Sequence, residues 1–460
     1  MEIFDRELNG MLLFSLLAAQ NGWQVLLGGK KSLFPLLGDL PQGIVVLKSV
    51  VPGEVEIQDK IRGYGHKVTS IDAEGLLPSN GKSGVELRYS SETISKSDKL
   101  FFWGPAQYDQ VKEYFPSISN IGAVTGSPIF DYWRLHKFSR HSVSNQDQKT
   151  ILIATSFPFA NHVIDPEQAY DAVRVASGKQ ASEEHLQEIF LGGALQEHVY
   201  PKFIEMVHTI SKTLIDYKVI LRPHPAESPT IWSEIAALYD NVELQYGGEI
   251  SKWLLECDYF IHFNSTTSIE ARYYDKQVIT LVPELKGELA DRLNEFALLA
   301  STVCRTSRDV LEAITESADP ASENSRLDLN GIIAGADSDD IALSSSNIVH
   351  HLEDLGPPDA VDRIMPSKIS LFFSLSTFKS MLKLRIIWLL GWIDYFTKVF
   401  NDRYAAMRHF YKYGKTKQGK LKANHLSTKV GMFADALKLQ RDMFRIGKIK
   451  NGLFLIRTRS

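Results

Sequence analysis

The amino-acid sequence predicts an α/β protein built from two parallel-sheet domains and a basic, helical C-terminal extension. Three observations support this prediction. Strand-like and helix-like segments alternate along most of the chain, with short connections marked by glycine, as is typical of parallel sheets with helices on both faces. A polar stretch without periodicity divides the alternating part into two halves. From Pro366 onward the chain is strongly basic.

Composition places the chain among soluble globular proteins. Of its 460 residues, 44% are hydrophobic and 23% are charged, and this length suits two or three domains. The two cysteines, Cys257 and Cys304, cannot form a disulfide framework and fit a reducing compartment. No basic segment precedes an apolar run at the start of the chain, so we expect no secretory signal and a cytoplasmic location.

The first domain is predicted over residues 1–134. Apolar residues recur at helical spacing at Leu8, Met11, Leu12, Leu16 and Leu17. Strand-like runs follow, separated by helix-like segments, at 23–29, 43–49, 66–75, 99–104 and 121–126. Such an order predicts a parallel sheet, because each helical connection returns the chain to the same edge.

A polar stretch, residues 135–149, is predicted to be an interdomain linker. The second domain follows at 150–317 and again alternates strand-like and helix-like segments. Its strands are expected at 150–157, 218–222, 241–246, 259–263 and 277–283, and its longest helix at about 183–215. Residues 318–365 are predicted to hold an exposed loop and then a crossover helix.

The C-terminal part, residues 366–460, carries 20 lysine and arginine residues against four aspartates, whereas the rest of the chain carries 31 basic and 51 acidic residues. Its aromatic stretch 371–400 is interrupted by charges, and the longest uncharged run in it, 386–393, is too short to span a bilayer. Amphipathic helices with aromatic residues opposite cations lie in the interface of anionic membranes. We therefore predict a membrane-associating helical tail; the alternative is a helical subdomain packed on the body.

Ligands of open α/β sheets bind at the carboxyl ends of the strands, so polar residues at these ends are the site candidates. One strand ends in Arg222 and His224, and Pro223 and Pro225 fix the backbone around the histidine. A histidine so placed can donate a hydrogen bond to a phosphate oxygen, and the arginine can add charge. The alternative is a strand-terminating proline pair with an exposed histidine.

The second candidate lies where another strand runs directly into a hydroxyl-rich turn. The turn consists of Asn264, Ser265, Thr266 and Thr267. Backbone N–H groups at a helix start, together with hydroxyl groups, form an anion site, and Glu270 one turn later could reach a ribose hydroxyl. The alternative is a capping box between Thr267 and Glu270, which needs no ligand.

A third candidate follows the first strand of the second domain. Its polar residues are Thr155, Ser156, Asn161 and His162. They could line the cleft, and a surface loop is an equally good interpretation.

The fourth candidate is a pair of carboxylates in the first domain. Asp72 and Glu74 end a strand two residues apart, so in an extended chain both point the same way. Such a carboxylate could accept the proton of an acceptor hydroxyl or attack the donor carbon itself. A strand-closing turn is the alternative, since aspartate and glycine are common there.

Signatures of metal and phosphate-loop chemistry are missing from the sequence. Residues 26–32 lack the spacing of a phosphate loop, and no H-x-x-x-H or H-E-x-x-H spacing occurs. We therefore expect no metal and no cofactor. In the arrangement that remains, residues 222–225 and 264–267 face one phosphate from two sides, which suits a nucleotide-linked donor bound without metal.

These segments together resemble bacterial surface-carbohydrate biosynthesis proteins, which are similar to the Kdo transferases of capsule and lipopolysaccharide assembly; Kdo is an acidic octulosonic sugar. The resemblance covers about residues 1–315 and rests on 6–28, 71–76, 124–134, 155–162, 222–225 and 264–271, in this order. It implies a GT-B fold, in which two Rossmann-like domains face a central cleft and the C-terminal one binds the sugar nucleotide.

The resemblance also implies roles for residues. His224 would contact the donor phosphate; the turn formed by Ser265, Thr266 and Thr267 would hold it; and Glu270 would approach the ribose. Asp72 or Glu74 would be the acidic catalyst, and the choice stays open. Asp131 and Arg134 would be structural. The implied donors are CMP-activated acidic sugars, which carry a single phosphate.

The expected function is that of a glycosyltransferase on the inner face of the cytoplasmic membrane. It would move a sugar, with Kdo expected, from a CMP-sugar to a growing surface polysaccharide or lipopolysaccharide glycan. Its expected partners are the nucleotide sugar, a glycan or lipid-linked glycan acceptor and an anionic membrane bound by residues 366–460, and no nucleic acid. The alternatives are a CDP-glycerol glycerophosphotransferase and a non-catalytic scaffold of a polysaccharide assembly complex.

Overall fold

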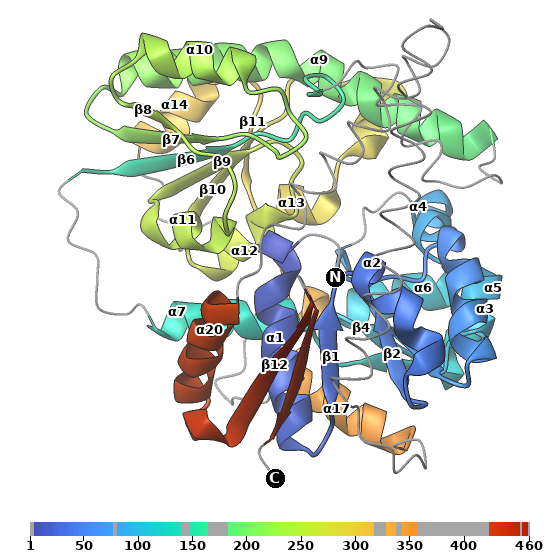
Figure 1. Cartoon of the computed structure of the whole chain (residues 1–460). Coiled ribbons are helices and arrows are strands. Elements are labelled where there is room, and N and C mark those ends of the chain that lie inside the picture. The colour runs from blue at the N-terminus through green and yellow to red at the C-terminus, as the bar shows by residue number, and fades with distance from the viewer. Residues whose placement is uncertain are drawn as a thin grey trace, which may run out of the picture.

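The computed structural model of the chain describes residues 4–76, 81–139, 148–163, 183–316, 328–336, 343–356, 423–450 and 453–458, and the structural statements below refer to these residues. Their strands form three sheets (Figure 1). Two of the sheets are parallel, and each belongs to one of the predicted domains. The predicted α/β class with two parallel-sheet domains is therefore confirmed.

The first parallel sheet has four strands in the order β2 (Ile44–Leu47), β3 (Lys67–Ile71), β4 (Lys99–Phe102) and β5 (Gly122–Val124). The elements between them are η2 (Pro52–Glu54), α3 (Val55–Gly63), α4 (Gly81–Arg88), α5 (Ser91–Ser95), α6 (Pro105–Tyr114) and η3 (Pro116–Asn120). Local sequence sets the helix starts, since Ser90 and Thr93 form a capping box before α5 and Pro105 opens α6.

The second parallel sheet has six strands in the order β11 (Thr302–Cys304), β10 (Gln277–Leu281), β9 (Tyr259–His262), β6 (Thr150–Ala154), β7 (Lys218–Arg222) and β8 (Val242–Leu244). Its helical elements are α9 (Glu183–Thr213), α10 (Thr230–Leu238), α11 (Ile250–Glu256), α12 (Thr267–Tyr273), η4 (Gly287–Arg292), α13 (Glu295–Leu299) and α14 (Ser307–Thr315).

The second sheet is covered on both faces, so its strands are continuous apolar runs. On β6, Ile151 and Ile153 pack in one cluster with α9, α10 and α14. The alternate residues Leu152 and Ala154 pack in another cluster with α11 and α12. This second cluster also holds Trp103 of the first domain, so the two domains meet through apolar side chains on the side of α11 and α12 (Figure 1).

The C-terminal part corrects the sequence prediction. Residues 444–458 were included in a helical tail, but they form the strands β12 (Phe444–Lys450) and β13 (Leu453–Thr458), preceded by α20 (Ala423–Ala436) and η6 (Arg441–Met443). Residues 366–422, which include the aromatic stretch, lie outside the described residues. In β12 and β13 apolar side chains alternate and face the core, which is the period of a strand.

β13 pairs antiparallel with β1 (Val25–Gly28), which the sequence had placed at the start of the first parallel sheet. The resulting sheet, in the order β1-β13-β12, packs its apolar face on α1 (Phe4–Gln20) and α20. The elements α2 (Lys30–Leu33) and η1 (Phe34–Asp39) follow β1. The two ends of the chain therefore build one unit, in which the sheet that packs on α1 takes β1 from the N-terminal part and β12 and β13 from the C-terminal part.

The connections between the domains are helical. α7 (Pro128–Ser139) continues into the range predicted as linker, and residues 140–147 lie outside the described residues. α16 (Leu329–Ile332) and α17 (Ser344–Asp354) follow the second domain, and α17 packs on α1 and α7, so the chain crosses back as predicted.

Asp131 holds this return crossing in place. Its buried carboxylate accepts hydrogen bonds from the backbone N–H groups of Ser344 and Ser345 at 2.8 and 2.7 Å, at the start of α17. Burial raises the pKa of Asp131 to about 6, although these hydrogen bonds oppose the rise. Arg134 donates to the carbonyl of Gly335. Both residues make structural contacts, in line with the roles expected for them.

Candidate active site

The loops predicted to bind the donor leave one edge of the second sheet. Strands β7, β6 and β9 are neighbours, and the register aligns Ala154 with both Arg222 and His262. The three strands therefore end at the same level, and the polar segments that follow them are brought together, as predicted for parallel strands.

Glu227 connects two of these loops. It is 3% exposed. Its carboxylate accepts hydrogen bonds from five donors at 2.6–3.4 Å, namely Thr155 Oγ1, Asn161 Nδ2, Trp232 Nε1 and the backbone N–H groups of Phe157 and His224. Sequence analysis missed this residue; the signal was an acidic residue three positions after His224 at a strand end.

Most of the third candidate segment, residues 155–162, is hydrogen-bonded to the carboxylate of Glu227. Thr155 is buried and donates to Glu227, and Asn161 donates both to Glu227 and to the carbonyl of Ser228 at 3.0 Å. The backbone of His162 forms a bridge with Glu227. These residues therefore shape the loop, and Ser156 is the member of the set that lines a cavity.

His224 is exposed at the end of β7. Its Nδ1 accepts a hydrogen bond from the backbone N–H of Ala226 at 3.2 Å, so a neutral ring carries its proton on Nε2. The loop thereby fixes both the orientation and the tautomer of the ring. Arg222 differs from expectation, since it donates to the carbonyls of Gly247 (2.6 Å) and Gly248 and so braces the neighbouring loop.

His262 supports the hydroxyl-rich turn, and sequence analysis missed it. Its ring is fully buried, and Nδ1 accepts from the backbone N–H of Ser265 at 3.2 Å. Nε2 lies 2.9 Å from Oγ of Ser301, which donates to a carbonyl, so Nε2 carries the proton. Burial lowers the pKa of His262 to about 3, so the ring is neutral and acts as a fixed support.

The turn itself has an unusual backbone. Asn264 has a φ of 49°, and its side chain donates to the carbonyl of Arg292 and accepts from the N–H of Asn294. Asparagine tolerates this left-handed conformation better than most residues. Thr266 is exposed, and no side chain caps α12 at this end. The Ser265 hydroxyl accepts from the backbone N–H of Thr267 at 3.3 Å, whereas the hydroxyl of Thr266, the N-cap residue, makes no capping hydrogen bond.

Glu270 does not form the capping box considered as an alternative. Its side chain is 5% exposed, and Ser251 of α11 donates to one of its oxygens. Burial raises the pKa of Glu270 to about 8, with the charge of Glu249 adding to the rise and the hydrogen bond of Ser251 opposing it. The carboxyl group is therefore mostly neutral at pH 7.

A cavity of about 310 Å³ lies at this edge of the second sheet. It is lined by Ser156 and Asn264 from two of the candidate segments, by Gln196 of α9, and by Arg292 and Asn294. Leu87 of α4 also lines it, so the cavity lies between the two domains. Arg292 was not singled out in the sequence, because it does not follow a strand.

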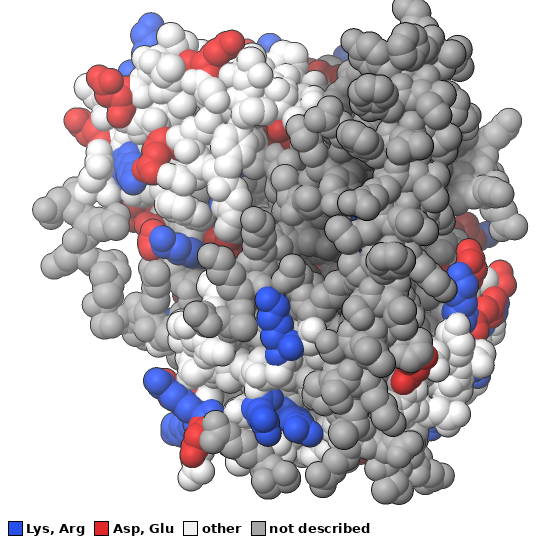
Figure 2. All heavy atoms as spheres, in the orientation of Figure 1, with Lys and Arg blue, Asp and Glu red and all other residues white. Residues whose placement is uncertain are grey.

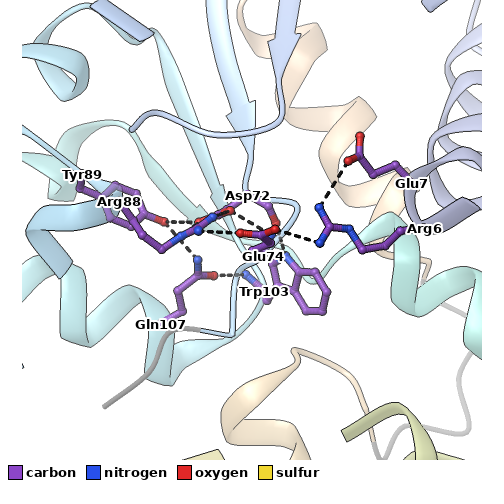
Figure 3. Close-up of polar contacts among 8 residues, drawn as sticks. All are labelled: Arg6, Glu7, Asp72, Glu74, Arg88, Tyr89, Trp103 and Gln107. Carbon is purple, nitrogen blue, oxygen red and sulfur yellow. Dashed lines mark hydrogen bonds and ion pairs between the residues drawn. The ribbon is translucent and has the colours of Figure 1, made fainter. Parts of the chain in front are cut away.

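The two carboxylates of the first domain, Asp72 and Glu74, share the partner Arg88 and differ in environment (Figure 3). Asp72 is 5% exposed. Arg88 donates to both of its oxygens, and the N–H of Glu74 (3.0 Å) and the hydroxyl of Tyr89 (3.4 Å) donate to it as well. Trp103 Nε1 donates to its backbone carbonyl at 2.6 Å. Asp72 therefore has the contacts of a structural group.

Glu74 is the accessible carboxylate, with half of its side-chain surface exposed. Arg6 Nη1 contacts one oxygen at 2.8 Å, and Arg88 Nη1 contacts the other at 2.9 Å. Burial would raise the pKa of Glu74, but the charges of Arg6 and Arg88 outweigh it and lower the pKa to about 2. Glu74 is thus ionised at any ordinary pH. Arg88 follows Leu87, which lines the cavity.

Within the described ranges, no group of three or more His, Cys, Asp or Glu side chains is arranged to hold a metal ion. Arg292 lines the cavity, Arg222 ends β7, and Arg6 and Arg88 pair with Glu74 on the first domain. The chemistry that this arrangement offers is anion binding on the second domain and an ionised carboxylate on the first.

Two parallel α/β domains with a cavity between them at the strand ends of the second, and a helix returning from the second to the first, define a protein of the GT-B fold class. No family model and no curated protein matches the sequence.

Solved structures give likenesses of the fold. A UDP-N-acetylglucosamine 2-epimerase from Listeria monocytogenes, described as putative, has 11% identity and a TM-score of 0.44, over 78% of this chain and 82% of that one. The S. aureus MnaA–UDP co-structure has 15% identity and a TM-score of 0.42, over 71% of this chain and 78% of that one. The wall teichoic acid polymerase TagF has 13% identity and a TM-score of 0.40, over 63% of this chain and 68% of that one. At these values, function is argued from the chain's own residues.

Proposed function

We propose that the protein is a metal-independent glycosyltransferase that moves a sugar, with Kdo as the proposed sugar, from a CMP-sugar to a growing surface polysaccharide or lipopolysaccharide glycan. The observation that carries the proposal is the meeting of the candidate loops of the second domain at a cavity that Leu87 of the first domain also lines. Arg88, the next residue, holds the ionised Glu74. In the proposed complex, the second domain binds the anionic leaving group of the donor, and the Glu74 carboxylate of the first domain approaches the sugar.

On the donor side, the proposed phosphate ligands are Nε2 of His224 and the hydroxyl groups of Ser265, Thr266 and Thr267. The ring of His224 is exposed and oriented by its loop, and His262 fixes the turn. Ser156, Asn264 and Arg292 line the cavity and suit the polar parts of a nucleotide sugar. These groups stabilise charge on the departing nucleotide.

On the acceptor side, the proposed reacting group is Glu74. A carboxylate with a pKa of about 2 is a poor proton acceptor near neutral pH, so proton abstraction by it is unfavourable. Its proposed role is attack on the anomeric carbon as the CMP phosphate leaves, which forms a glycosyl ester. The acceptor hydroxyl then displaces the Glu74 carboxylate and loses its proton to solvent, with net retention of configuration.

Replacing His224 by alanine should weaken CMP binding by at least about tenfold, because a hydrogen bond to a charged phosphate is lost. Isothermal titration calorimetry measures the change. His350→Ala is the matched control, since His350 is an exposed histidine on α17 in the first domain. Equal CMP affinity of the two variants and the unchanged protein would contradict the role of His224.

The nucleotide itself is tested by a thermal-shift series with CMP, CDP, UDP, GDP and their sugars, because a ligand of the folded state raises the melting temperature. A response to CMP and CMP-Kdo supports the proposal. A response to CDP-glycerol, with transfer of a phosphate to the product, would assign the protein to the glycerophosphotransferases. A protein that responds to none of these ligands would fit a scaffold.

We also propose that the protein binds the anionic inner face of the cytoplasmic membrane through residues 366–460. No helix within the described residues is both long and apolar enough to cross a bilayer. In Figure 2 basic side chains gather over β12 and one end of α20, where Lys438, Arg445 and Lys448 are exposed. Phosphate headgroups of anionic lipids attract such a surface.

Replacing residues 366–422 by a Gly-Ser linker of equal length should reduce binding to anionic vesicles in flotation assays, since cations and aromatic residues are lost. Deletion to the C-terminus is unsuitable, because it removes β13 and with it the partner of β1. Vesicles of neutral lipid provide the control. Undiminished flotation of the variant with anionic vesicles would show that this segment does not bind the membrane.

A further inference from the structure

A polar junction joins the C-terminal unit to the second domain. Lys429 of α20 is 14% exposed at its side chain. Its ammonium group donates to Oδ1 of Asn9 on α1 at 2.6 Å and to Oε1 of Glu249, just before α11. Lys429 and Asn9 belong to the unit built from the two chain ends, and Glu249 belongs to the second domain, so this ion pair crosses between domains.

The junction continues to α12, the helix that follows the hydroxyl-rich turn. The other oxygen of Glu249 accepts a hydrogen bond from the hydroxyl of Tyr132 on α7 at 2.9 Å. Two residues later, Ser251 of α11 donates to Glu270 of α12. A chain of contacts therefore runs from Lys429 through Glu249 and the start of α11 to the carboxyl group of Glu270.

The charges in this junction are balanced by Lys429. Burial would raise the pKa of Glu249, but the hydrogen bond and charge of Lys429 outweigh it, and the net pKa lies below the usual value. Around Glu270, burial and the charge of Glu249 raise the pKa, and Ser251, Tyr274 and Arg222 oppose the rise. The junction thus holds the cation Lys429, the ionised carboxylate of Glu249 and the mostly neutral carboxyl group of Glu270.

Such a network tolerates little change, because a half-buried carboxylate that loses its cation is destabilised. Loss of Lys429 would force Glu249 either to take up a proton or to turn toward solvent. The turn toward solvent moves the start of α11, which carries Ser251. Glu270 is on the neighbouring helix and has its carboxyl group oriented by Ser251, so its position would change too.

We propose that Lys429 is a positioning residue of the nucleotide site: by holding Glu249 it fixes the start of α11, and through Ser251 and Glu270 it fixes α12. The turn that is proposed to hold the phosphate is at the start of α12. The C-terminal helix is thereby part of the nucleotide-binding body, although Lys429 and Glu249 are 180 positions apart. The inference takes the identity of the ligand from the proposed function, and the contacts that carry it do not depend on that function.

The test replaces Lys429 by methionine, which keeps the length of the side chain and removes its charge. CMP affinity measured by calorimetry should fall about tenfold, an ordinary size for coupling between two sites. Lys429→Arg should restore most of the affinity. Lys31→Met is the matched control, because Lys31 is an exposed lysine of α2, directly after β1, and should leave the affinity unchanged. Wild-type affinity of Lys429→Met would overturn the inference.

A second measurement separates this inference from the proposed function. In Lys429→Met, hydrogen exchange of the backbone amides of α11 should become faster while that of β10 stays unchanged, and no ligand is needed for this result. If the unchanged protein binds none of the nucleotides but exchange in α11 rises, the proposed function fails and the positioning role stands. Unchanged exchange in α11 would refute the role of Lys429.

Glu249→Gln provides an independent variant if Lys429→Met does not fold. It keeps the volume and an oxygen for the Tyr132 hydroxyl but removes the charge that pairs with Lys429. The same loss of affinity is expected, and the double variant should be no weaker than either single variant, because both changes break one interaction. Additive losses would show that the two residues act separately.

Discussion

Glu74→Gln should abolish turnover and leave nucleotide affinity unchanged. The substitution keeps the shape of the side chain but removes the negative charge that Arg6 and Arg88 hold at the edge of the cleft. Loss of the nucleophile of a covalent mechanism lowers turnover by on the order of 10⁶-fold. Transfer assays with CMP-Kdo measure the rate, and calorimetry with CMP measures the affinity.

Glu86→Gln is the matched control. Glu86 is on α4, and half of its side-chain surface is exposed, as for Glu74, but it pairs with Lys82. It should retain full activity. Because the pKa of Glu74 is about 2, the activity of the unchanged protein should show no acidic limb from this group between pH 4 and 7. Full activity of Glu74→Gln would remove Glu74 from the mechanism.

Asp72→Asn is expected to behave differently from Glu74→Gln. Asp72 is buried and pairs with Arg88, so its loss leaves a guanidinium group without its main partner. Breaking a buried pair costs about 3–5 kcal/mol of unfolding free energy. Chemical denaturation should show the loss of stability. A stable but inactive Asp72→Asn protein would reverse the assignment of the two carboxylates.

Glu227→Ala should cause the second large effect, on stability and on nucleotide binding together. Its carboxylate accepts hydrogen bonds from five donors that join the loops after β6 and β7. Each buried donor left without an acceptor costs about 1–3 kcal/mol, so the unfolding free energy should fall by on the order of 3 kcal/mol or more. The same change frees the loop that orients His224.

Urea unfolding and CMP calorimetry on one preparation test both parts of this expectation. Glu243→Ala is a suitable control, because Glu243 is an exposed residue of β8 that pairs with Lys218; its loss should cost less than about 1 kcal/mol. A Glu227→Ala protein with wild-type stability and affinity would show that these hydrogen bonds do not organise the site.

Much of the fold was predictable from the sequence. The strands that begin the second domain, β6, β7 and β9, are continuous apolar runs bounded by polar turns, and such patterns depend only on residues close together in the chain. The position of the candidate segments followed as well, since parallel strands end at one edge.

The C-terminal part shows where such prediction fails. Composition and charge suggested a helical tail, whereas the alternation of Phe444, Ile446, Phe454 and Ile456 belongs to a hairpin that pairs with β1. Nothing local to β1 reveals that partner, because it lies more than 400 residues away in the sequence. The partner of β1 depends on which distant segment packs against α1 in the folded chain.

The sequence by itself determined the two alternating α/β halves, the polar residues at their strand ends and the basic character of the C-terminal part, because periodicity and composition are local properties. Only the tertiary structure distinguished the buried Asp72 from the accessible Glu74, and only it revealed Glu227 and Lys429. The physical reason is that burial and hydrogen bonding depend on neighbours in space, and these neighbours come from distant parts of the chain.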